Sequence, residues 1–97
     1  MVLDHSFADG QLTREQVTWP GCGEAARTWL GELHARWAGA IAGLDDEDLS
    51  SPARTRWPFR DRPFADVVAW ANLELMKNAS EIGYARFLHA VRGAAAV

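Results

Sequence analysis

The sequence predicts an all-α protein built on two long antiparallel helices, and three observations lead to this prediction. Residues 24–44 place apolar side chains at intervals of three and four, the spacing of a helix that buries one face. Residues 63–92 form a longer helical pattern that is apolar on nearly every side. No stretch shows the period-two alternation of a β-strand. Two such helices make half of a four-helix arrangement, so we expect a second chain to complete it.

Composition narrows the class of protein. The 97 residues, 48% hydrophobic and 24% charged, predict a single packed domain over residues 1–97. A net charge of -3 provides no basic surface of the kind that binds nucleic acid. No apolar run is long enough to span a membrane. With Cys22 as the one cysteine and no apolar leader after Met1, we expect a cytoplasmic protein without disulfides. The excess of arginine over lysine hints at a GC-rich bacterial genome.

The N-terminal third leads into the first long helix. Residues 1–7 are weakly helical, and residues 8–10 break them before a connector over residues 11–23. The helix is expected over residues 24–44. Its apolar stripe consists of Ala26, Trp29, Leu30, Leu33, Trp37, Ile41 and Leu44. Three glycines within it weaken the helix by about 1 kcal/mol each, so packing must supply much of its stability.

The second long helix is expected over residues 63–92. The acidic run at residues 45–48 predicts a solvated turn or a short helical segment. Asp61 can cap the next helix and Pro63 suits its first turn, while residues 93–97 are expected to fray. At 1.5 Å per residue this helix is about 45 Å long, roughly 13 Å longer than the first.

Apolar side chains surround this second helix, so one neighbouring helix cannot cover it. They are Val67, Trp70, Leu73, Leu75, Met76, Ile82, Tyr84, Phe87, Leu88 and Val91. A helix that is apolar all round is normally a buried one. We therefore predict a homodimer that forms a four-helix core.

Three polar residues interrupt one stripe of that helix. Glu74, Asn78 and Glu81 follow the i, i+4, i+7 spacing and share a face with Val67 and Ala71. Their oxygens suit a ligand site for Mg, Mn or Ca rather than Zn. The alternative is a buried polar network that fixes helix register in a dimer. Glu81 is also a candidate binding residue.

The histidines and tryptophans each allow two interpretations. If the long helices pack antiparallel, His34 faces the polar stripe and joins Glu74 and Asn78 as a metal ligand; otherwise it is a boundary residue. Trp37 and Trp70 are candidates for an aromatic ligand pocket, and core packing is the alternative.

Smaller expectations concern the remaining chemistry-bearing residues. His5 is expected to be exposed, and His89 to pack near a helix end. Cys22 lies close to a helix N-terminus, where a thiol can gain reactivity, although no His or Lys stands beside it in the sequence.

Three motifs together resemble the DinB-like superfamily, particularly its actinobacterial, mycothiol-dependent thiol transferase members. The similarity runs from about Leu3 to Arg92 and covers the C-terminal half of the family's fold. It is carried by Phe7-Ala8-Asp9-Gly10, by Trp19-Pro20-Gly21 with the helix start Ala25 to Leu30 and its closing turn Leu44 to Leu49, and by Asn72 to Gly83 with Arg86.

This resemblance implies a four-helix bundle and a metal site. Many members bind a divalent metal through a His-x-x-x-His pair on the fourth helix and a histidine from the second, and several are thiol S-transferases or maleylpyruvate isomerases. Glu74 and Asn78 correspond to the paired histidines, and the region that carries the third histidine is not in this chain. The resemblance thus implies a relative of metal-dependent thiol S-transferases with a degenerate metal site. The alternative is a non-catalytic oligomerisation or subunit module. Whether the chain is an enzyme stays open, with a weakly bound divalent metal and a small-molecule or thiol ligand as candidates.

Overall fold

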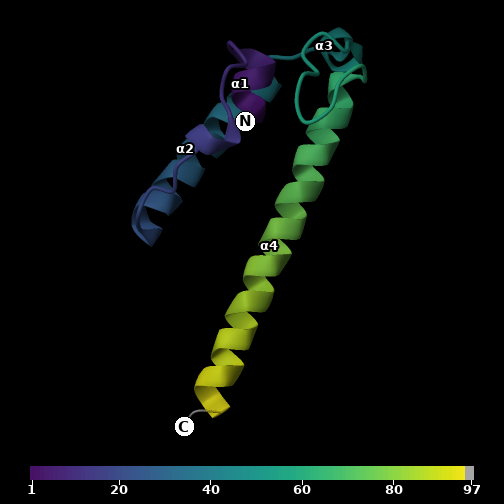
Figure 1. Cartoon of the computed structure of the whole chain (residues 1–97). Coiled ribbons are helices and arrows are strands. Elements are labelled where there is room, and N and C mark those ends of the chain that lie inside the picture. The colour runs from purple at the N-terminus through teal and green to yellow at the C-terminus, as the bar shows by residue number, and fades with distance from the viewer. Residues whose placement is uncertain (96–97) are drawn as a thin grey trace. The chain divides into compact units, whose positions relative to one another are not determined.

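The computed structural model describes residues 1–95, and all regular structure among them is helical (Figure 1). The elements are α1 (Val2–Phe7), the 3-10 turn η1 (Arg14–Gln16), α2 (Gly23–Ala42), α3 (Asp46–Ser50) and α4 (Phe64–Ala95). The all-α prediction is therefore confirmed for this part of the chain. Within it, no helix combines the length and the apolar character that crossing a bilayer would require.

The chain divides into two compact units, Met1–Val67 and Val68–Val97. The first unit holds α1, η1, α2, α3 and the first turn of α4, and the second holds the rest of α4. The antiparallel packing of the two long helices and the single domain over residues 1–97 stay predictions.

Helix α2 begins where a capping side chain becomes available. Cys22 is the N-cap residue in an extended conformation, and its Sγ accepts a hydrogen bond from the Ala25 backbone N–H at 3.5 Å. The helix ends at Ala42, two residues earlier than expected, because Gly43 forms the C-cap and the Leu44 N–H turns back to the Ile41 carbonyl.

The best-buried side chains of the first unit lie at the start of α4. Phe64 and Val67 are fully buried. The ring of Phe7 in α1 meets the edge of Phe64 at a centroid distance of 5.6 Å and of Trp37 in α2 at 6.4 Å. The Arg54 guanidinium lies over Phe7 at 5.2 Å. This aromatic cluster joins α1, α2 and the first turn of α4.

The segment between α2 and α4 is held by short-range hydrogen bonds. The acidic run forms α3, and Asp45 and Asp48 make a reciprocal capping box at its start. The Phe64 N–H donates to the Ser51 carbonyl at 3.0 Å, which ties the beginning of α4 to the end of α3.

Asp61 is not the N-cap of α4, contrary to the expectation from sequence. Its φ of 59° lies in the left-handed region, and α4 begins three residues later at Phe64. Aspartate tolerates this conformation better than most residues, and Asp61 forms part of a bend just before the helix starts.

His5 is half-buried rather than exposed. Its Nε2 lies 2.9 Å from the Leu12 carbonyl oxygen, and its ring stacks at 6.4 Å on that of Trp57. The neighbouring Asp4 carboxylate accepts a hydrogen bond from the Leu12 N–H at 2.9 Å. These contacts fasten the connector to α1, which explains why an N-terminal histidine is not solvated.

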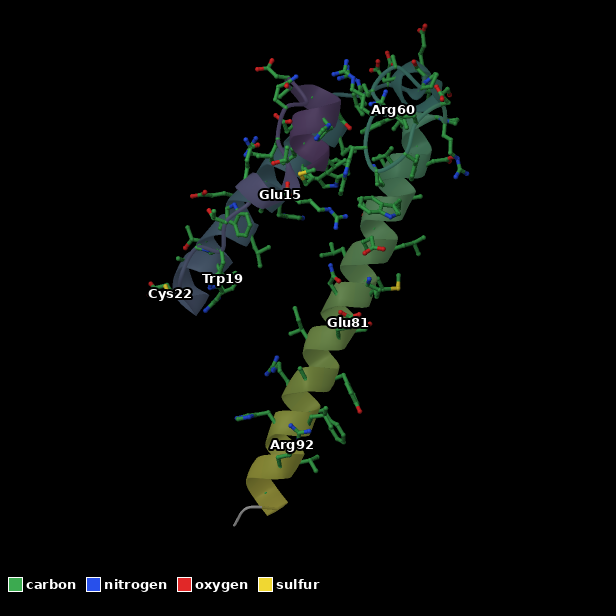
Figure 2. All side chains as sticks on the ribbon, in the orientation of Figure 1. Glu15, Trp19, Cys22, Arg60, Glu81 and Arg92 are labelled. Atoms are coloured by element: carbon green, nitrogen blue, oxygen red, sulfur yellow. The ribbon has the colours of Figure 1, made fainter. Side chains whose placement is uncertain are left out.

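Helix α4 is one continuous helix of 32 residues that extends three residues beyond the predicted end. Gly93 to Ala95 were expected to fray but are helical; residues 96 and 97, also expected to fray, lie outside the described part. Side chains project from α4 around its circumference (Figure 2). Seven large apolar side chains on it are exposed: Leu73, Leu75, Met76, Ile82, Tyr84, Phe87 and Val91.

Candidate functional site on α4

The three polar residues of the predicted site lie within α4, as their helical spacing indicated. Asn78 and Glu81 are exposed, and Glu81 projects from the middle of the helix (Figure 2). Glu74 is half-buried, with 41% of its side chain exposed. Burial of Glu74 and Asn78 in a bundle interior was predicted for the assembled dimer, and it stays a prediction.

Glu74 has a partner that the site prediction did not include. The Lys77 ammonium lies 3.3 Å from a Glu74 carboxylate oxygen, three residues along the same helix. Because both side chains are substantially exposed, such an ion pair contributes at most about 0.5 kcal/mol. The i, i+3 spacing of opposite charges was the sequence signal that identifies it.

The donor set in residues 1–95 does not fit the family's metal centre. No three His, Cys, Asp or Glu side chains come together there in a way that could hold a metal ion. Glu74 and Asn78 offer oxygens from one helix, one turn apart, whereas Ca requires six or more and Zn favours nitrogen and sulfur. The Glu74 carboxylate is also engaged by Lys77. No chemical step through a metal can be derived from these residues.

The predicted residues of α2 lie in the other compact unit. His34 is exposed. Its predicted role as a metal ligand beside Glu74 and Asn78 stays a prediction. Trp37 is half-buried against the edge of Phe7, a contact that favours a packing role over a ligand-binding role. Trp70 is half-buried on α4, and its binding role stays a prediction.

A shallow, open groove of about 530 Å³ runs along α4 beside the polar stripe. It is lined by Leu73, Met76, Lys77, Ser80, Glu81 and Tyr84. Its lining is mostly apolar, and Lys77 and Glu81 contribute one amine and one carboxylate to it. The sequence prediction singled out Glu81 from this set but not the groove, because it treated the apolar side chains as an all-round surface.

A second open groove, of about 390 Å³, lies at the start of α2. Cys22, Trp29, Glu24 and Glu32 are among the residues that line it. The Cys22 thiol is exposed, and its hydrogen bond to the Ala25 N–H is the ordinary contact of a helix cap.

The described residues form an all-helical structure whose longest helix, α4, carries Glu74, Asn78 and Glu81. The sequence model of the DinB superfamily matches residues 1–82, and the chain belongs to that superfamily. The match includes Glu74, Asn78 and Glu81 as well as the first unit. Comparison with curated proteins and with solved structures gives no match.

Proposed function

We propose that this chain is a non-catalytic assembly module of the DinB superfamily, which pairs with a second copy of itself through α4 to form a helical bundle. One observation carries the proposal. Seven large apolar side chains of α4 are exposed in the single chain, each by between 48% and 65%. A soluble protein rarely leaves so many apolar side chains uncovered on one element unless it binds another surface there.

The energetics support association. Complete burial of one large apolar side chain gives about 1.5–3 kcal/mol, and a symmetric dimer gains this contribution from both chains. Association costs about 4–15 kcal/mol in lost rigid-body freedom. Covering the remaining exposed part of four or five such side chains on each chain therefore gives a gain of the same size as that cost. An isolated helix also gains from packing, because helices without a partner are marginal in water.

The ion pair between Glu74 and Lys77 supports the non-catalytic assignment. A carboxylate that binds the lysine of its own helix is a weaker metal ligand than a free one. In the assembled dimer, Glu74 and Asn78 then serve to fix helix register, as buried polar groups do in some coiled coils.

The second candidate is a degenerate thiol S-transferase with a weak, oxygen-liganded metal site. It is favoured by the i, i+4 spacing of Glu74 and Asn78, which places two oxygen donors one turn apart on α4. Two chains, together with water, would have to complete the coordination shell. Metal affinity would then depend on assembly, and His34, Trp37, Trp70 and Glu81 would be the remaining binding residues.

Light scattering over a range of concentrations tests the proposal. We expect a dimer at micromolar concentration with an interface above about 2,000 Å² in total. A folded monomer throughout that range would refute it. Thiol transfer that requires added Mg, Mn or Ca and is lost in Glu74→Gln would favour the second candidate instead.

A further inference from the structure

The α4 groove is nearly symmetric about its own midpoint. Leu73 and Tyr84 lie equally far from the point between Asn78 and Ala79, and so do Lys77 and Ser80. These positions belong to a stripe that alternates intervals of four and three residues: 73, 77, 80, 84, 87 and 91. This spacing is that of a seam between two helices that wind around each other, with four apolar positions and two polar ones, Lys77 and Ser80, at the centre.

We propose that the groove is the contact site for a second copy of α4, packed antiparallel about a two-fold axis at that midpoint. This inference rests on the proposed function and specifies its interface. Antiparallel packing about this point sets Leu73 against Tyr84 of the second copy and Lys77 against Ser80 of the second copy. Each contact occurs twice, as a two-fold axis requires.

The charges in the groove distinguish antiparallel from parallel packing. In the antiparallel arrangement, Lys77 and Glu81 of the second copy lie within one residue of the same height along the helix. Lys77 then pairs with Glu74 of its own chain and with Glu81 of the other. Parallel packing in register would instead set Lys77 against Lys77 of the second copy, an unfavourable contact between like charges.

A small residue, Gly83, on one flank of the groove leaves room for a second copy of α4 to approach. A Cβ added at Gly83 would meet no atom within 4 Å, so the backbone is open there. Met76 lies two residues closer to the midpoint than Gly83, about 3 Å along the helix axis, so its flexible, 65% exposed side chain can reach across to Gly83 of the second copy.

Disulfide trapping between two cysteine variants of the chain tests this arrangement. In a Cys22→Ser background, Leu73→Cys and Tyr84→Cys proteins are oxidised separately and after mixing. We expect a disulfide-linked dimer at least tenfold more abundant in the mixture than in either protein alone. Leu73→Cys or Tyr84→Cys linking mainly to itself would show parallel packing and overturn the proposal.

The matched control uses the opposite side of the same helix. Leu75→Cys and Ile82→Cys are equally symmetric about the midpoint, but they lie roughly 160° or more around α4 from Leu73 and Tyr84. They should give little linked dimer on mixing. Linking as efficient as that of the groove pair would overturn the assignment of the interface.

A charge exchange provides an independent readout that leaves the apolar side chains in place. Lys77→Glu and Glu81→Lys should each self-associate about tenfold more weakly, because each sets like charges together. Their mixture should recover the wild-type affinity, since each mutant side chain then meets an opposite charge on the other chain. No recovery on mixing would overturn the antiparallel register.

These experiments separate the interface from the proposed function. A wild-type dimer whose groove variants neither cross-link nor recover on mixing would leave the assembly module intact and reject the α4 groove. A wild-type chain that stays monomeric would reject both.

Discussion

Alanine substitution of two phenylalanines on α4 should affect two different quantities: the folding stability of the chain at Phe64, and the affinity of the dimer at Phe87. Phe64 is fully buried, its ring lies 5.6 Å from that of Phe7, and its N–H bonds to Ser51. Phe87 is 60% exposed. Phe64→Ala removes a buried ring and leaves a cavity, so we expect a loss of about 3–5 kcal/mol in the free energy of unfolding. That is a large part of the stability of a small domain.

Phe87→Ala should barely change the stability of a single chain, because less than half of the ring is buried there. Its cost should appear in association. Covering the exposed part of the ring gives about 1–2 kcal/mol per chain, and two chains contribute. The dissociation constant of the dimer should therefore rise by about 100-fold.

Urea unfolding followed by tryptophan fluorescence, at protein concentrations from 1 to about 100 times the wild-type dissociation constant, measures both effects. Phe64→Ala should lower the unfolding midpoint at every concentration, whereas Phe87→Ala should lower it mainly where the wild type is dimeric. Phe64→Leu is the milder control for a variant that does not fold. A loss below about 1 kcal/mol for Phe64→Ala, or equal concentration dependence of both variants, would refute this reasoning.

Three further predictions concern the polar residues and the cysteine. Asn78 is exposed in the single chain and is predicted to be buried in the dimer, so Asn78→Leu should leave the stability of the protein unchanged or raise it, because apolar replacement of a buried polar group is often neutral; a fall of more than about 1 kcal/mol in stability would show that Asn78 makes an essential contact. Elemental analysis of protein purified without chelators should find no stoichiometric Zn, and finding Zn or Ni at one per chain would show that the family's metal site survives. Cys22→Ser should preserve or increase stability by about 0.5 kcal/mol in thermal melts, since serine is a better N-cap; a clear loss would assign the thiol another role.

Local periodicity was sufficient to predict the helices. Apolar spacing located α2 and α4 to within three residues at each end, because a helix that buries one face must repeat every three to four residues. The ends were less accurate, since Gly43 stops α2 early and the alanines after Gly93 continue α4. The left-handed backbone of Asp61 was not predicted, because it depends on the conformation of the whole loop.

Contacts between distant residues were not predictable in the same way. The cluster of Phe7, Trp37 and Phe64 joins three elements, and nothing in the separate helical patterns specifies which aromatic residues meet. The site shows the same limit. Spacing correctly set Glu74 and Asn78 one turn apart, but what faces them depends on the assembled protein.

The lysine at the centre of the α4 groove is the only one among the 97 residues. Its ε-amine is therefore the one lysine side-chain amine among these residues with which amine-directed reagents can react. Lys77 thus gives the groove a chemical reporter that needs no mutation: its acylation rate, read by mass spectrometry, falls when the groove is covered. Dimer formation, binding of a foreign helix and crowding at high concentration could each be followed at this single atom in the unaltered protein.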